Sequence, residues 1–224
     1  MLDLKISDRL HTVSLFVRDG AILADIGTDH AYLPIYLALN NKIKLGYASD
    51  INLGPIERAK ENIKRFKLEE KIFTNVASGL ENIENIKPTD IAICGMGGEL
   101  IAKIIDASSY VRNNKIRLIL QPMTCVKELR EYLQNGFSTI DENVIFEDGK
   151  LYQIICVEYD GCYHELSEVE KEIGPKNLVN KGTFVDKLIN STIVKKRKIA
   201  DGMKQGGYDI INIEKEISDL EKLL

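Results

Sequence analysis

Two short segments of this 224-residue chain combine glycine with polar side chains in a way that suits the binding of a small ligand. The first segment, 24–31, reads ADIGTDHA, and the second, 94–99, reads CGMGGE. Each follows an apolar run typical of a buried strand, and in an open α/β sheet ligands bind beyond the carboxyl ends of the strands. Glycine lets a backbone approach such a ligand closely. We therefore expect both segments to line one site.

The first segment indicates the charge of the ligand. A nicotinamide-binding loop would read GxGxxG, whose glycines bring a helix N-terminus close to a pyrophosphate. In this chain Asp29 and Tyr32 stand where the second and third glycines would be. Because a carboxylate would repel a pyrophosphate, the loop favours a cationic ligand. S-adenosylmethionine fits, since it carries a sulfonium and an ammonium but no phosphate.

Two further segments suit a nucleoside. Asp50 ends the next apolar run, 25 residues after Asp25, and a carboxylate at that point can accept both hydroxyls of a ribose. Ser78, Gly79 and Leu80 follow the third run and could hold an adenine, although a simple turn explains them nearly as well.

The elements that position these residues alternate in type, which predicts an α/β protein with a mostly parallel sheet. Apolar runs that predict strands occupy 21–26, 43–48, 72–76, 91–94 and 116–120, and helical patterns occupy 32–39, 55–66, 99–105 and 126–133. Two alternating segments, 139–146 and 151–159, flank an Asp-Gly turn and predict an antiparallel hairpin at the end of the sheet. Ser7 is a plausible cap for a short helix before the first strand.

The last part of the chain predicts a helical appendage. We expect a ligand-binding domain over residues 1–163 and a coiled-coil-like helical hairpin over 164–224, with its turn at Gly206-Gly207. The spacing of the final apolar residues forms a seam suited to another helix. These residues are Ile210, Ile213, Ile217, Leu220 and Leu224. The partner stripe is expected within 177–203, from Leu178, Val185, Leu188, Ile189, Ile193 and Ile199. Such a seam can pack within one chain or between two, so we expect a monomer or a weak homodimer.

Charge separates the two parts. The net charge of −4 belongs to residues 1–160, whereas residues 176–204 carry eight basic residues against Asp186 and Asp201. A run of this kind can follow a nucleic-acid backbone, although it is more often a solvated helix face. The side chains expected to contact a nucleic acid are Lys187, Lys195, Lys196, Arg197, Lys198 and Lys204.

Composition excludes several classes of protein. A chain with 44% hydrophobic and 29% charged residues is neither collagen-like nor disordered. No apolar run is long enough to span a bilayer and no leader is apparent, so we expect a cytoplasmic protein. The four cysteines contain no CxxC pair and the three histidines have no metal-binding spacing, so we expect reduced thiols and no metal site.

The motifs together resemble a known family. SDRLHTV, ADIGTDHAYLPIYL, ASDINLGPIERAKENI, ICGMGGELI and LILQPMTCVKELREYLQNGF are similar to the bacterial tRNA (adenine-22, N1)-methyltransferases called TrmK, and the resemblance covers nearly the whole chain. It implies a Rossmann-like class I methyltransferase domain with a C-terminal helical hairpin. It also implies methylation of N1 of adenine 22 in tRNA with S-adenosylmethionine.

The resemblance also implies the binding residues. The expected cofactor contacts are Arg9, His11, Asp25, Gly27, Thr28, Asp29, His30, Asp50, Ile51, Ser78, Gly79, Leu80, Gly95, Met96 and Gly97. One departure is visible, because we would expect GDGL or GNGL where this chain has Ala77-Ser78-Gly79-Leu80. A hydroxyl there replaces a carboxylate or an amide that would contact the adenine.

The chemistry of the acceptor limits what a catalytic group must do. N1 of neutral adenine has a free lone pair, so the enzyme needs no dedicated base. It must align the reactants and accept the positive charge that moves onto the purine. Asp29 is the expected catalytic residue, with Gln121 and Tyr152 as groups that orient the base, but Asp29 could equally hold only the cofactor or His30. An adenine inside folded tRNA must first be exposed, so base flipping is expected.

Other functions remain open at this stage. One is an S-adenosylmethionine-dependent methyltransferase of another RNA, a protein or a small molecule, and in that case the basic helix would be idle. Another is a non-catalytic adaptor that binds the cofactor or RNA. A nicotinamide dehydrogenase is disfavoured by Asp29.

Overall fold

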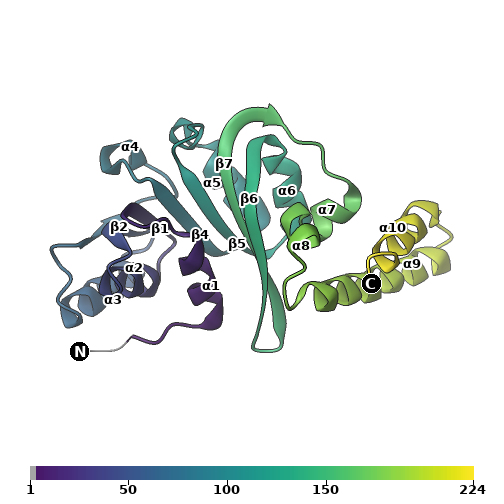
Figure 1. Ribbon diagram of the computed structural model, residues 1–224, viewed down its shortest axis with the longest axis horizontal. Coiled ribbons are helices and arrows are strands. Elements are labelled where there is room, and N and C mark those ends of the chain that lie inside the picture. Colours follow the sequence, from purple (N-terminus) through teal and green to yellow (C-terminus); the bar gives the residue numbers. More distant parts are fainter. Residues whose placement is uncertain (1–3) are drawn as a thin grey trace.

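The centre of the computed structural model, which describes residues 4–224, is a seven-stranded sheet (Figure 1). The strand order is β3-β2-β1-β4-β5-β7-β6, with β7 antiparallel to both of its neighbours and the other pairs parallel. The strands are β1 (Ala21–Ile26), β2 (Ile43–Asp50), β3 (Ile72–Val76), β4 (Asp90–Gly97), β5 (Arg117–Thr124), β6 (Asn135–Glu147) and β7 (Lys150–Tyr163). The predicted α/β class, the five parallel strands and the closing hairpin are confirmed.

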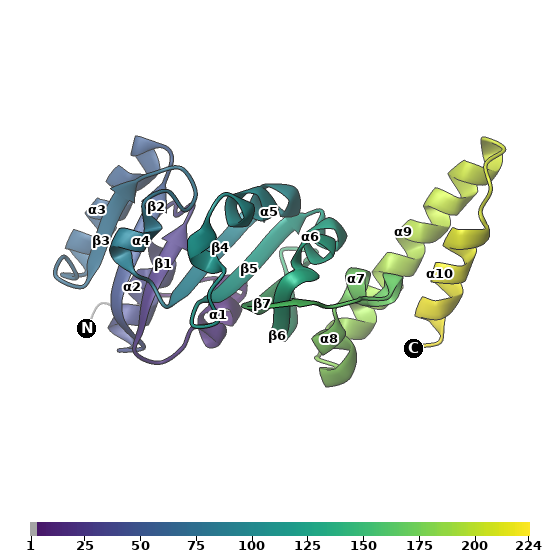
Figure 2. The same cartoon turned by 90° about the horizontal axis from the view of Figure 1, so that it is seen from above.

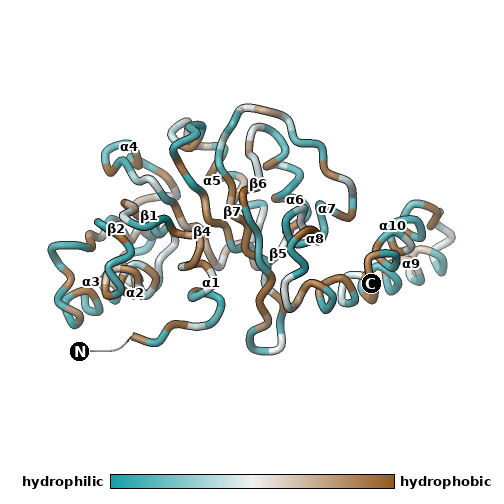
Figure 3. Tube along the Cα trace, viewed as in Figure 1, coloured by the Kyte–Doolittle hydropathy of each residue, from teal (hydrophilic) through white to brown (hydrophobic). Residues whose placement is uncertain are grey.

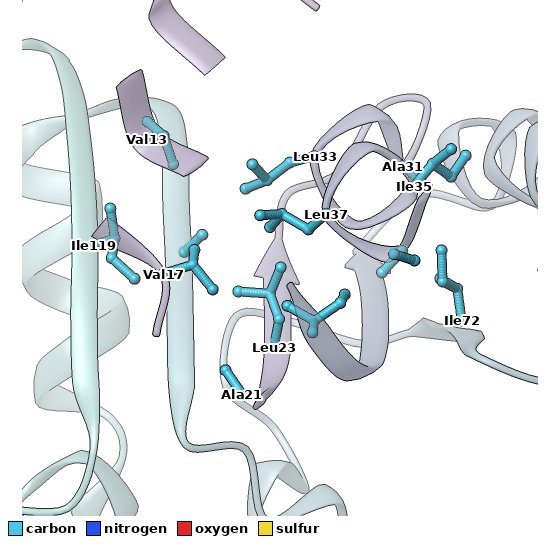
Figure 4. Close-up of a cluster of buried hydrophobic side chains, with 14 of the residues drawn as sticks. Val13, Val17, Ala21, Leu23, Ala31, Leu33, Ile35, Leu37, Ile72 and Ile119 are labelled. Carbon is cyan, nitrogen blue, oxygen red and sulfur yellow. The ribbon is translucent and has the colours of Figure 1, made fainter. Parts of the chain in front are cut away.

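Helices cover both faces of the sheet. They are α1 (Asp8–Phe16), α2 (Tyr32–Leu39), α3 (Leu53–Arg65), α4 (Ile83–Ile86), α5 (Gly98–Asp106) and α6 (Val126–Leu133), with a 3-10 turn, η1, at Ser109–Val111. One core, shown in Figure 4, joins α1, α2 and α3 to one face through side chains such as Val13, Leu37 and Leu23. A second core joins α5 and α6 to the other face through Ile101, Leu129 and their neighbours. Successive strand residues alternate between the two cores because side chains in a strand alternate in direction.

The first helix begins where the sequence predicts. Ser7 caps α1, because its Oγ accepts a hydrogen bond of 3.3 Å from the backbone N–H of Leu10. The helix packs against α2 and against β6, β7 and β5. It therefore covers the part of the sheet where the parallel strands meet the antiparallel hairpin.

The C-terminal part projects from the sheet. Two short helices, α7 (Glu168–Ile173) and α8 (Pro175–Asn180), pack against α6 and β6. The long helix α9 (Val185–Gln205) then runs outward and α10 (Ile211–Glu221) returns along it (Figure 2). A third core of Ile173, Val185, Ile189 and Leu220, among others, holds these helices together. Figure 3 shows the result, with apolar stretches along the central strands and mixed coloring along α9 and α10.

The helical part differs from the sequence prediction in detail. The helix expected over 177–203 is divided into α8 and α9, because Lys181 takes a left-handed conformation (φ +46) that ends α8. The seam is confirmed at Ile217 and Leu220, which bury against α9 of the same chain. Ile199 and Leu224 are exposed, and Ala200 takes the buried position next to Ile199.

Two helices were not predicted from the sequence. Helix α4 is only four residues long, too short for a periodic pattern. Helix α7 begins with a capping box in which the Ser167 and Glu170 side chains each accept from the other's backbone N–H. The Ser-x-x-Glu spacing was available as a signal for this helix.

Candidate active site at the carboxyl edge of the sheet

The loop between β1 and α2 is tied to the end of β2. The backbone N–H groups of Gly27 and Thr28 both donate to Ser49 O, at 2.7 and 2.9 Å. Gly27 has a φ of +76, and a Cβ at this position would lie 2.1 Å from the Met96 Cε. The positive φ favours glycine here, and the contact shows that the loop at the end of β1 lies against the Met96 side chain from the turn at the end of β4. The two segments selected from the sequence form one site.

Asp25 is a buried acid beside this loop. Its side chain lies on the same face as α1, only 7% of the residue is exposed, and burial raises its pKa from 3.8 to about 6. A hydrogen bond from the Thr28 hydroxyl lowers the pKa and partly opposes this effect. Burial raises the pKa of the nearby Cys94 thiol, and the Asp25 charge raises it further. No cationic side chain forms an ion pair with Asp25 within residues 4–224. A ligand cation would therefore relieve the cost of burying this carboxylate.

Asp29 is exposed and already has basic neighbours. Its carboxylate forms ion pairs with Arg58 of α3 and, at 3.1 Å, with His30 Nε2. The His30 ring stacks on Tyr32 with 4.9 Å between ring centroids, and Asn62 Nδ2 donates to the His30 carbonyl at 3.1 Å. The charge of Asp29, three residues before α2, is thus partly neutralised by Arg58, a partner that the sequence did not reveal.

The ends of β2 and β3 carry the residues expected to hold a nucleoside. Asp50 Oδ1 accepts from the Asn52 N–H at 2.7 Å, and no hydrogen bond to Oδ2 is formed by any residue of the described chain. Ser78 is exposed, whereas the Leu80 side chain is 6% exposed and packs in the core with α5. Only the backbone of Leu80 can therefore contact a ligand. Ile51 is 64% exposed beside Asp50.

The start of α5 fixes the turn after β4. A Cβ on Gly98 would lie 2.0 Å from the carbonyl oxygen of Cys125, so the first residue of α5 packs on the backbone that leads into α6. The Gly95 N–H donates to Gln121 Oε1 at 3.2 Å. The turn that includes Met96 is thus fixed at its start by Gln121 of β5 and at its end by Cys125, the residue just after β5.

Arg9 joins two of the three expected catalytic residues. Its Nη1 donates to Gln121 Oε1 at 2.5 Å, and its guanidinium lies 5.2 Å from the centre of the Tyr152 ring. Gln121 is fully buried, and its Nε2 donates to Pro122 O at 2.9 Å. All the polar atoms of Gln121 are therefore used inside the protein, so the amide holds Arg9 and Gly95 and is not free to orient a base. Tyr152 is half-buried and Asp29 lies in a separate cluster with Arg58.

The sequence missed one acid of this cluster. Glu147, the last residue of β6, accepts from the backbone N–H and the Nε of Arg9. It lies far from the glycine motifs in the sequence, and only the pairing of β6 with β7 brings it there. His11, expected near the cofactor, is exposed and packs edge-on against Tyr36 with 6.0 Å between ring centroids.

The residues expected to contact nucleic acid differ in availability. Lys196 is 8% exposed and forms ion pairs with Glu172 at 2.7 Å and Glu216 at 2.6 Å, because its position faces α7 and α10. Arg197 pairs with Glu221, and Lys187 Nζ lies 3.1 Å from the centre of the Phe146 ring. Three of the six are exposed, with no ion pair to another described residue: Lys195, Lys198 and Lys204. The prediction that Lys196 contacts nucleic acid is therefore wrong, because this side chain is buried between two helices and stabilises their packing.

The donor set at this edge fits a cationic nucleoside such as S-adenosylmethionine. Asp25 offers a buried negative charge, Asp50 offers a free carboxylate oxygen, and Gly27 follows β1 without a side chain that could cover either of them. Among residues 4–224 there is no group of three histidine, cysteine or acidic side chains arranged to hold a metal ion, and no helix there is long and apolar enough to cross a membrane. All four cysteines are unpaired thiols.

Comparison with known proteins gives consistent matches. Residues 6–155 match the family model described as a methyltransferase domain. A Bacillus subtilis tRNA (adenine(22)-N(1))-methyltransferase is 41% identical over 169 residues, which cover 72% of this chain and 71% of that protein.

Two solved structures are similar over almost the whole chain. Mycoplasma capricolum TrmK in complex with S-adenosyl-homocysteine is 33% identical with a TM-score of 0.81, covering 97% of this chain and 96% of that one. A Streptococcus pneumoniae protein in complex with S-adenosyl-L-methionine is 32% identical with a TM-score of 0.86, covering 98% and 100% of the two chains.

Proposed function

We infer from its membership of the tRNA (adenine(22)-N(1))-methyltransferase family that this chain methylates N1 of adenine 22 in tRNA, with S-adenosyl-L-methionine as the methyl donor. The observation that carries the inference is the 41% identity to the Bacillus subtilis enzyme. The buried Asp25 and the free Asp50 oxygen support it, because they suit a cationic nucleoside, and Asp29 in place of a loop glycine disfavours a dinucleotide.

We propose the following contacts to the donor, which supplies an electrophilic methyl group when bound. Asp50 accepts hydrogen bonds from ribose hydroxyls, and the buried Asp25 balances positive charge. The backbone around Gly27 and Thr28 and the turn 95–97 enclose the methionine part, while Ser78 and Gly79 lie beside the adenine. These assignments rest on the positions of the residues at the strand ends.

We propose that Tyr152 and Asp29 act on the acceptor side. The transfer needs no base, since N1 of adenine has a free lone pair, so alignment is the main task of the protein. The Tyr152 ring, held by Arg9, offers a face on which a flipped adenine could stack. The Asp29 carboxylate, although paired with Arg58, contributes negative charge toward the purine as it becomes cationic.

We further propose that the helical region 164–224 binds the tRNA backbone. Lys195, Lys198 and Lys204 are exposed on one long helix that projects from the sheet domain. Basic side chains along a helix can follow phosphates. Because the seam of α10 is filled by α9 of the same chain, we propose a monomer, working in the cytoplasm where tRNA is found.

The test is mass spectrometry of digested tRNA after incubation with the protein and isotope-labelled donor. We expect label in 1-methyladenosine at position 22. Label in another nucleotide, or turnover without RNA, would favour a methyltransferase of different substrate. Binding of the donor without transfer would favour an adaptor. Asp29→Ala separates its two roles, because loss of labelling with unchanged donor affinity would make Asp29 catalytic.

A further inference from the structure

The closed end of the β6–β7 hairpin lies between α1 and the start of α9 (Figure 1). Side chains at this end alternate in direction along β6. Phe146 lies 6.1 Å from Phe184, measured between ring centroids, and Lys187 of α9 contacts its face. The next residue, Glu147, contacts α1 on the opposite face. The hairpin end is thus in contact with both α9 and α1, the helix that covers the junction between the parallel strands and the hairpin.

The Glu147 carboxylate accepts a hydrogen bond from the first turn of α1. One carboxylate oxygen accepts from the Arg9 backbone N–H at 3.0 Å, and the other lies 3.4 Å from Arg9 Nε. The first N–H groups of a helix have no partner inside the helix, and a negative charge at this end is favourable. The Glu147 side chain is 15% exposed. A single carboxylate therefore fixes both the backbone and the side chain of Arg9.

Arg9 connects Glu147 to the turn 95–97 after β4, because Arg9 and Gly95 bind the same side chain. Its Nη1 and the N–H of Gly95 donate to the same oxygen of Gln121, at 2.5 and 3.2 Å. Gln121 is fully buried, so it has no water to replace either partner. A continuous chain of polar contacts thus runs from the end of β6, through α1 and β5, to the turn after β4.

We propose that Glu147 is a positioning residue for methyl transfer, which sets the acceptor-side wall of the site by fixing Arg9 against Gln121 and the Tyr152 ring. The proposal rests on the proposed function. Glu147 need not touch either substrate. Its contribution is to the geometry in which they meet, and a misplacement of about 1 Å in such a geometry can cost about 100-fold in rate.

A matched control exists on the neighbouring strand. Arg117 and Glu158 form a second half-buried arginine–glutamate pair, with 2.9 Å between Nε and Oε1, at the opposite end of the β5–β7 ladder. The exposed fractions of both pairs are similar, at 23% and 15% for Arg9 and Glu147 and 22% and 24% for Arg117 and Glu158. Glu158→Gln therefore reports the general cost of losing such a pair.

The experiment compares Glu147→Gln and Glu158→Gln by single-turnover methylation of tRNA, with donor and tRNA affinities measured separately. We expect Glu147→Gln to slow the methyl-transfer step about 10- to 100-fold while both affinities change less than about twofold. Glu158→Gln should leave the step unchanged. Equal rates for the two variants, or a rate loss explained by weaker binding, would overturn the proposal. Failure of the wild-type protein to methylate tRNA would instead overturn the proposed function.

Arg9→Lys keeps the test decisive if Glu147→Gln folds poorly. Lysine retains the positive charge but cannot bridge a carboxylate and an amide with a planar fork. We expect the same slowing of the methyl-transfer step, and the double variant should be no slower than either single variant because both break one chain of contacts. Rates that multiply in the double variant would show that Glu147 and Arg9 act independently and would contradict the proposal.

Discussion

The carboxyl edge of the sheet and the projecting α9–α10 hairpin use charged side chains in opposite ways. At the edge, Asp25 is buried with no ion-pair partner in residues 4–224, and Asp50 keeps one oxygen free of hydrogen bonds from that same part of the chain. In the hairpin, Lys196 forms ion pairs with Glu172 and Glu216. Arg197 forms an ion pair with Glu221. Uncompensated charge at the edge is available for a ligand, whereas much of the charge in the hairpin stabilises the fold. In this protein a buried acid without an ion-pair partner is therefore better evidence for a ligand site than a run of basic residues is.

The largest expected effect tests the edge. Asp50→Asn should weaken donor binding about 100-fold, because hydrogen bonds to a charged group contribute about 1.5–3 kcal/mol each. Isothermal titration with S-adenosylmethionine measures it. Asp106→Asn, at the far end of α5, should bind the donor normally. Similar affinities for the two variants would remove Asp50 from the ribose site and would weaken the contrast between the two regions.

Asp25→Asn should weaken donor binding and make the folded protein more stable at pH 7. The folded-state pKa of about 6 lies above the ordinary value of 3.8, so the wild-type protein loses stability as pH rises from about 4 to about 6 and stays at that lower level above it. At pH 7 the variant should be more stable by about 3 kcal/mol, because the pKa is raised by about 2 units and one unit corresponds to about 1.4 kcal/mol.

The same substitution should flatten the pH dependence of donor binding. In the wild-type protein the affinity should fall as pH drops below about 6, because Asp25 gains a proton and no longer attracts a cation. Chemical denaturation and calorimetry between pH 5 and pH 8 test both effects. A variant that is destabilised at pH 7 would show that the interactions of the Asp25 carboxylate with its neighbours, such as the Thr28 hydroxyl, outweigh the cost of burying its charge.

Lys196→Ala and Arg197→Ala should differ in stability although the residues are neighbours. Lys196 is buried between two glutamates, so its loss leaves them facing each other and should cost about 2 kcal/mol. Arg197 and Glu221 are exposed, and their pair should contribute less than about 0.5 kcal/mol. Thermal melts should show a decrease of about 4–8 °C for the first and about 1 °C for the second. Equal decreases would mean that the Lys196 charge is solvated.

The smallest effect concerns the free lysines of α9. Lys195→Gln with Lys198→Gln should weaken tRNA binding about 5- to 10-fold and lower the salt dependence by about two counterions. Donor affinity should stay the same. The matched double variant Lys44→Gln with Lys71→Gln, on exposed positions at the β2–β3 edge, should bind tRNA normally. Equal tRNA binding by both double variants would remove α9 from the interface.

Local sequence was sufficient for the framework and for the glycine turns. The segment ADIGTDHA specifies a strand, a tight turn and a helix within a few residues, so the position of Asp25 and Gly27 follows from local rules. The role of Gln121 could not be predicted, because its partners are Arg9, 112 residues earlier, and Gly95. Glu147 and Arg58 were missed for the same reason. The charge run on α9 did not distinguish Lys196 from Lys195, because only the packing of α7 and α10 buries one of them.

The position of β7 also dictates the order in which the newly made chain can be completed. Among residues 4–224, β6 pairs with β7 alone, and the edge of β5 that faces away from β4 also pairs with β7 alone. Both must wait until residues 150–163 have left the ribosome, so a long unpaired edge persists late in synthesis and is exposed to aggregation. The helix α1 is one of the first elements made, and the N–H of Arg9 in its first turn donates to Glu147, the last residue of β6. The first turn of α1 therefore gains this contact only after the whole of β6 has been made.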